Sequence, residues 1–172
     1  MRRRSLLGAV ATGVTAGIGG CLGGHVIVEK QESVRIEAHR SWAEEIEEAD
    51  GSGSISYTVR SEDERFQVFY FTQEENYRQY REITLGSGNP QEPGRSDVPT
   101  GHEELSRIAV RNDERDVFEV EMPRDDGRYE MEFDQTHYFV VDYSNYGMGI
   151  QVPETAHPLQ VSVGLEVVED RF

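Results

Sequence analysis

The sequence predicts an all-β protein, an antiparallel jelly-roll-like β-sandwich of seven to eight strands with one short helix. Three observations predict this fold. Apolar and polar residues alternate in several short segments, which is the period of a half-buried strand. Turn-forming Gly, Pro, Asn and Asp separate those segments at short intervals. The length of 172 residues suits one domain, and 7 Phe and 8 Tyr supply large side chains for its core.

The expected strands follow the alternation along the chain. Phe66, Val68 and Tyr70 lie on one face of their segment, whereas Phe69 and Phe71 lie on the other. We therefore expect this segment to be a central strand that is covered on both sides. The expected strands span residues 34–38, 55–59, 65–71, 118–122, 129–133, 138–143 and 159–167.

Two further features concern how strands connect. Residues 118–122 and 129–133 alternate in step around Asp126-Gly127, and Asp-Gly is a strong signal for a tight turn, so we expect a hairpin. Gly51-Ser52-Gly53-Ser54 is expected to be a flexible turn before a strand.

Helix is expected in few places. Thr72-Gln73-Glu74-Glu75 has the spacing of a capping box, which predicts a short helix from Gln73 to about Arg81 that covers the sandwich edge. Residues 41–50 fit either a helix or a strand, because Trp42 and Ile46 suit both periods, and a strand is slightly favoured. Residues 85–104 are rich in Gly, Pro, Ser and Asn, which indicates a long surface loop.

The N-terminus has the layout of an export signal, with a basic head, a short apolar run and small residues before a cut. The pair Arg3 and Arg4, followed by Leu6 and Leu7, resembles the twin-arginine motif, which a receptor reads as an address. Ile18-Gly19-Gly20-Cys21 resembles a lipobox, and Cys21 is the only cysteine. We therefore expect residues 1–20 to be removed as a signal peptide, residues 21–24 to form a lipidated tether, and residues 25–172 to form the β-sandwich domain.

The charge balance limits the partners and suggests the environment. The 17 basic and 33 acidic residues give a net charge of −16, and Lys30 is the only lysine. Such an acidic surface disfavours nucleic acid, since phosphate binding needs a basic face. Self-repulsion of this size also works against the compact state, unless molar salt screens it. Many carboxylates with few lysines resemble the proteins of salt-in halophilic archaea.

The strand series resembles a known family of sandwiches. Residues 55–59, 66–71 and 138–144 occur in the order of GOLD/emp24-like jelly-roll domains found in archaeal lipoproteins, and Asp126-Gly127-Arg128-Tyr129 is similar to the "dGxY" turn of that family. The chain has Asp142-Tyr143 where such domains commonly have Asp-Asn. The resemblance covers roughly residues 25 to 169 and implies interaction with a protein or surface rather than catalysis, as an analogy of fold.

Motifs for chemistry are sparse. The five histidines lack a metal-ligand spacing, so we expect mainly solvated residues. A blue-copper site needs a thiolate, and lipidation would consume the only thiol. Acidic turns such as Glu62-Asp63-Glu64 lack the spacing of an EF-hand loop, and no Gly-x-Ser-x-Gly motif occurs. We expect no catalytic residue, metal site or cofactor.

One loop is a candidate ligand site. Residues 142–149 combine two tyrosines with amide and carboxylate groups, so Tyr143, Asn145 and Tyr146 could contact a sugar or a peptide. The other interpretation is that the tyrosines close the end of the sandwich.

The sequence thus favours a non-catalytic interaction or accessory module, lipid-anchored on the extracytoplasmic face of the cell membrane, with a protein or glycan partner at the cell surface. The alternative is a small carboxylate- or calcium-dependent hydrolase.

Overall fold

The computed structural model describes residues 24–49, 51–86, 99, 101–122, 128–147 and 149–170. The predicted export motif and Cys21 lie outside the described residues. The elements, in chain order, are β1 (Gly24–Ile36), β2 (Arg40–Ile46), β3 (Ser52–Ser61), β4 (Gln67–Phe71), α1 (Glu74–Gly86), β5 (Arg107–Ile108), β6 (Val110–Asn112), β7 (Val117–Glu121), β8 (Tyr129–Glu132), β9 (His137–Tyr143) and β10 (Leu159–Asp170).

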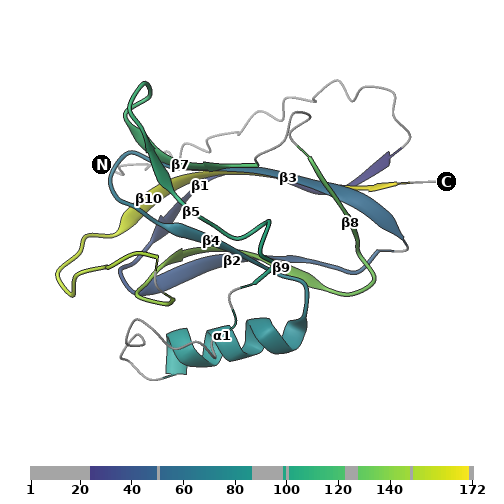
Figure 1. The fold of residues 1–172 in the computed structure, drawn as a ribbon, viewed down its shortest axis with the longest axis horizontal. Coiled ribbons are helices and arrows are strands. Elements are labelled where there is room, and N and C mark those ends of the chain that lie inside the picture. Colours follow the sequence, from purple (N-terminus) through teal and green to yellow (C-terminus); the bar gives the residue numbers. More distant parts are fainter. Residues whose placement is uncertain are drawn as a thin grey trace, which may run out of the picture.

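Two antiparallel sheets are stacked face to face, and α1 lies on the outer side of one of them (Figure 1). Sheet A has the order β1-β10-β3-β7-β6, with β8 also paired to β3, and sheet B has the order β2-β9-β4-β5. The all-β sandwich predicted from the sequence is confirmed. The described residues contain ten strands, compared with the seven to eight predicted. The sequence did not reveal β5 and β6, because they are too short for their alternation to be visible.

The pairing is nested in the manner of a jelly roll. The first strand pairs with the last, β2 pairs with β9, β3 pairs with β7 and β8, and β4 pairs with β5. A chain folded once into a long antiparallel hairpin and then wrapped over itself gives this pattern. Alternate side chains of each sheet therefore face a shared interior, as the alternating burial along β3 and β10 shows.

The predicted hairpin around Asp126-Gly127 is wrong. Glu121 lies opposite Thr58, and Tyr129 lies opposite Ile55, so β7 and β8 occupy the same edge of β3 one after the other. Both strands run antiparallel to β3, and they cannot pair with each other. The Asp-Gly dipeptide itself lies outside the described residues. Both segments are strands, as predicted, but each pairs with β3 and not with the other.

The segment Gly51–Ser54, expected to be a flexible turn, is mostly strand. Only Gly51, with φ of +124°, provides the turn, whereas Ser52 to Ser54 belong to β3. A Cβ atom at Gly53 would collide with the carbonyl oxygen of Val168 and lie 2.9 Å from the ring of Phe133. This glycine is therefore required by close packing against β10, and not by flexibility.

Segment boundaries also shift. Gly24, assigned to the tether, is the first residue of β1 and lies opposite Asp170. Residues 41–46 form a strand, as favoured, with Trp42 opposite Val141.

The helix begins at Glu74 and extends to Gly86, beyond the predicted end at Arg81. It covers the face of sheet B, and not the sandwich edge (Figure 1). Most of the predicted loop 85–104 lies outside the described residues.

Candidate functional site

The outer face of sheet B carries a second apolar cluster, separate from the core between the sheets. Along β4 and β9, alternate residues point to the two sides, and every residue of both strands is buried. This confirms that β4 is a central strand covered on both sides. The inner residues join the core between the sheets, and the outer residues meet α1. The helix-face cluster consists of Phe69, Phe71, Tyr80, Tyr138, Val140 and Tyr146, with Tyr77 and Ile83 packed against it.

A carboxylate is buried at one end of this cluster. Asp142 is 0% exposed, and it follows Tyr138 and Val140 on the outer face of β9. Its Oδ1 accepts hydrogen bonds from the hydroxyls of Tyr80 (2.6 Å) and Ser144 (2.9 Å). Its Oδ2 accepts from Nε2 of Gln67 (2.8 Å) and from the amide of Ser144 (3.2 Å). We call this group of contacts the Asp142 network. It joins α1, β4 and β9, so it fixes how the helix sits on the sheet.

Burial dominates the electrostatics of the Asp142 network. Loss of water raises the pKa of Asp142 above its ordinary value, and the hydrogen bonds from Tyr80, Gln67 and Ser144 oppose that rise. Burial likewise raises the pKa of Tyr80, and the charge of Asp142 adds to the effect. Among the described residues, all the hydrogen-bond donors to this carboxylate are neutral, and none is a cation. The network is closed to solvent, so its role is to stabilise the packing of α1 on sheet B.

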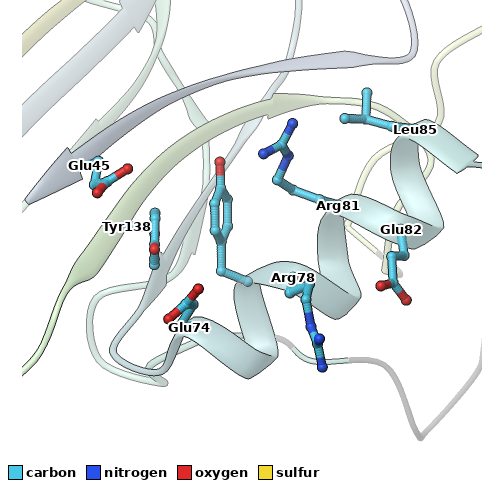
Figure 2. A pocket seen from close by; sticks show the side chains of 8 residues that line it. Glu45, Glu74, Arg78, Arg81, Glu82, Leu85 and Tyr138 are labelled. Carbon is cyan, nitrogen blue, oxygen red and sulfur yellow. The ribbon is translucent and has the colours of Figure 1, made fainter.

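A hollow of about 450 Å³ opens beside α1, at the other end of the helix-face cluster (Figure 2). We call it the α1 groove. It combines aromatic rings with charges of both signs and one exposed aliphatic side chain, since Leu85 is 45% exposed. Its lining residues are Glu45, Glu74, Tyr77, Arg78, Arg81, Glu82, Leu85 and Tyr138.

A row of four side chains forms the body of the groove. Tyr77 of α1 stacks on Tyr138 of β9, with ring centroids 3.9 Å apart and an interplanar angle of 16°. The guanidinium carbon of Arg81 lies 5.9 Å from the Tyr77 centroid. Glu45 lies directly opposite Tyr138 across the β2–β9 pair. In Figure 2, Glu45 and Arg81 lie on opposite sides of Tyr138, and Arg78 points away from them.

Burial and nearby charges act together on the two phenols of the groove. Burial raises the pKa of Tyr138, and the carboxylates of Glu45 and Glu74 raise it further while Arg81 lowers it. Burial also raises the pKa of Tyr77, with Arg81 lowering and Glu45 raising it. The same carboxylate and the same guanidinium therefore act on both phenols. Anionic, cationic and neutral polar groups thus converge on one open hollow.

The predicted ligand loop does not present an aromatic surface. Tyr143 is 2% exposed and packs in the core between the sheets, whereas Tyr146 is 1% exposed and belongs to the helix-face cluster. The two rings lie on opposite sides of sheet B. Asn145 is partly buried, and its Oδ1 accepts a hydrogen bond from the amide of Val152 (2.5 Å). The expectation that these tyrosines contact a ligand is wrong, because strand and loop geometry turns them inward.

Tyr146 is therefore expected to contribute to stability. Its hydroxyl donates to the carbonyl oxygen of Pro99, so Tyr146→Phe should lower the free energy of unfolding by about 1 kcal/mol. Tyr143→Phe is a matched control with a smaller expected effect, since its hydroxyl donates no hydrogen bond among the described residues. Denaturant unfolding in molar salt measures both variants. Equal losses would contradict the assigned role of the Tyr146 hydroxyl.

The expectation of mainly solvated histidines holds for His25 and His157, which are exposed, but not for all five. His137 is 1% exposed, and its Nδ1 lies 2.9 Å from the hydroxyl of Tyr70 within the interior. Burial lowers its pKa, which favours the neutral ring. The ring nitrogens of His39 are also buried, without a hydrogen-bond partner in the described part of the chain. No group of three or more His, Cys, Asp or Glu in the described ranges is arranged to hold a metal ion.

The groove residues were not identified from the sequence, although a partial signal existed. Tyr77, Tyr80 and Ile83 follow one another at intervals of three residues, which marks one face of a helix. The position of Glu45 beside Tyr138 depends on the register of two distant strands, for which the sequence carries no local signal.

No protein-family model matches the chain, and no curated protein shows significant sequence similarity to it. Function is therefore inferred from the geometry of the folded domain and from the motifs in the sequence.

Proposed function

We propose that this chain is a lipoprotein of the extracytoplasmic face of the cell membrane, whose β-sandwich is a non-catalytic binding module. The α1 groove is its binding surface. Export through a twin-arginine signal at Arg3 and Arg4, and anchoring through lipid on Cys21, complete the proposal.

The observation that carries the binding role is the contrast between the α1 groove and the Asp142 network. Asp142 is the described carboxylate whose pKa is raised, as a general acid requires, yet it is sealed from solvent by its own hydrogen-bond donors. The α1 groove is open and combines aromatic, apolar and charged side chains, the composition typical of recognition sites. This favours binding over the alternative of a carboxylate-dependent hydrolase.

The position of β1 supports attachment of lipid at Cys21. Gly24 already pairs with Asp170, so only two residues, Leu22 and Gly23, separate the expected lipid-bearing cysteine from the folded sheet. The domain would therefore stand close to the membrane surface. Within the described residues, no helix is both long and apolar enough to cross a bilayer.

Replacement of Cys21 tests the anchor. Cys21→Ser removes the sulfur to which lipid would attach, so the protein is expected to move from the membrane fraction to the soluble fraction. Cell fractionation with immunoblotting measures the distribution, and mass spectrometry of the wild-type protein should find a lipid-modified N-terminal Cys21.

A matched control is Ser33→Cys combined with Cys21→Ser, which restores a thiol at an exposed site on β1 without restoring the lipobox. It should remain soluble. An unmodified cysteine with an intact leader in the wild-type protein would overturn the proposed anchoring.

A further inference from the structure

The α1 groove contains charges of both signs, and this limits the ligands that it fits. An anionic group would face Glu45 and Glu74 on a chain of net charge −16. A cationic group would be attracted by the carboxylates of the lining, but beside the aromatic pair it would face the guanidinium of Arg81, which already lies over the ring of Tyr77. Like charges placed next to each other at a binding surface cost affinity. A neutral ligand that both donates and accepts hydrogen bonds meets neither penalty.

Arg81 has the capacity to bind such a ligand. Its guanidinium forms no ion pair among the described residues, and its described contact is with the ring of Tyr77. Arg78, one turn away, is instead paired with Glu75. A guanidinium donates up to five hydrogen bonds and accepts none, whereas the carboxylate of Glu45 only accepts. The two ends of the row therefore offer complementary hydrogen-bonding groups.

The middle of the row provides apolar contact on a rigid base. Tyr77 stacks on the buried Tyr138 and lies beneath Arg81, so its ring supplies carbon surface beside the guanidinium. The exposed Leu85 adds carbon surface beyond Arg81, on the side away from Glu45 (Figure 2). The Asp142 network fixes α1 against the sheet through Tyr80, so the groove does not have to be ordered by its ligand. The hollow of about 450 Å³ lies within the range of small-molecule sites, which is about 300–1,000 Å³.

We propose that the α1 groove binds a neutral saccharide, with ring hydroxyls bonded to Glu45 and Arg81 and C–H groups resting on Tyr77 and Leu85. Sugar hydroxyls donate and accept at once, which matches a carboxylate at one end and a guanidinium at the other. Alternating hydroxyl and C–H groups also match a row that alternates polar and apolar contacts. This inference rests on the proposed binding function and names its ligand class.

Calorimetric titration of the full chain in molar salt tests the proposal. The probes are the neutral trisaccharides maltotriose, cellotriose and mannotriose, with the anionic trigalacturonic acid and a cationic glucosamine trimer as charge controls. At least one neutral trisaccharide should bind saturably and more tightly than either charged probe. Arg81→Gln and Glu45→Gln should each weaken that binding about tenfold or more, which is about 1.4 kcal/mol.

Matched controls separate groove contacts from a general change of charge. Arg35→Gln and Glu37→Gln remove an exposed arginine and an exposed glutamate that pair with each other between β1 and the following turn, so affinity should not change. Tyr77→Phe removes the hydroxyl of Tyr77 but keeps the ring that stacks on Tyr138. The packing of α1 is therefore retained, and a change of affinity in this variant would not come from a displaced helix.

Two results would overturn the ligand class. One is that no neutral trisaccharide binds saturably, and the other is that binding is unchanged by Arg81→Gln and Glu45→Gln. If a polypeptide captured from the cell surface then binds in a manner that depends on these two residues, the proposed binding function stands and the saccharide is rejected. If the protein is not anchored at the membrane, the proposed membrane location is wrong, whether or not the groove binds a saccharide.

Discussion

Asp142→Ala is expected to lower the free energy of unfolding by about 3–4 kcal/mol, because it leaves buried donors without an acceptor. The Tyr80 hydroxyl and the Ser144 amide would lose their bonds to the carboxylate, and Nε2 of Gln67 would keep only the carbonyl oxygen of Tyr146. Denaturant unfolding in molar salt, followed by circular dichroism, measures the loss. For a domain of this size, a melting temperature lower by about 2–4 °C per kcal/mol should accompany it.

Asp142→Asn is the control that separates hydrogen bonding from charge. Oδ2 faces Nε2 of Gln67 and the amide of Ser144, which only donate, so the asparagine oxygen fits there. Oδ1 faces the hydroxyls of Tyr80 and Ser144, which can rotate to accept from an NH₂ group. The variant should therefore retain most of the stability lost in Asp142→Ala. Equal losses would show that the negative charge itself is required.

The pH dependence of these variants has a defined sign. Burial raises the pKa of Asp142 in the folded protein above its unfolded value of about 3.9. A raised carboxyl pKa contributes stability that is fully present below the unfolded pKa and is lost as pH rises through the folded pKa. The stability of the wild type relative to Asp142→Asn should therefore fall as pH rises above about 4. Constant relative stability would contradict the raised pKa.

Transfer from molar salt to dilute buffer is expected to unfold the domain or reduce its stability strongly. The Debye length grows from about 3 Å at 1 M to about 30 Å at 0.01 M, so exposed carboxylates that are screened in high salt begin to repel each other. Glu48, Asp134 and Glu169 line a single hollow at one end of the sandwich. Glu62, Asp63 and Glu64 follow one another, exposed, between β3 and β4.

A triple variant locates part of this repulsion. Glu48→Gln, Asp134→Asn and Glu169→Gln together should lower the salt concentration at the unfolding midpoint, because three like charges leave one hollow. Glu75→Gln is the matched control, since Glu75 pairs with Arg78 and its removal relieves no repulsion of this kind. Salt titrations followed by circular dichroism measure both. Full two-state stability of the wild type in dilute buffer would contradict both the repulsion and the proposed halophilic environment.

One property of strand alternation explains both the correct prediction for β4 and the wrong pairing for β7 and β8. Alternation reports which face a residue occupies, and it correctly placed Val68 and Phe69 on opposite sides of β4. It does not report which strand lies alongside. The segments around Asp126-Gly127 were therefore assigned to each other, although both pair with β3. A turn signal between two strands is local, whereas the nested pairing depends on the whole chain.

The candidate site shows the same difference between local sequence signals and contacts that depend on the whole chain. From the sequence, Tyr143 and Tyr146 were candidates for a ligand site because they are close in the chain, and the other interpretation was that they close the end of the sandwich. The structure buries both rings and brings together Tyr77 and Tyr138, which are 61 positions apart. Stacking of that pair requires α1 to lie flat on sheet B, which depends on the Asp142 network.

By itself, the sequence determined the all-β class, the faces of the central strands, and the acidic, lysine-poor character of the chain, because these follow from composition and from the two-residue period of a strand. Only the tertiary structure decided which strands pair, where the helix lies and which tyrosines remain beside an open groove. Those features arise from contacts between residues that are distant in sequence, and no local pattern specifies such contacts.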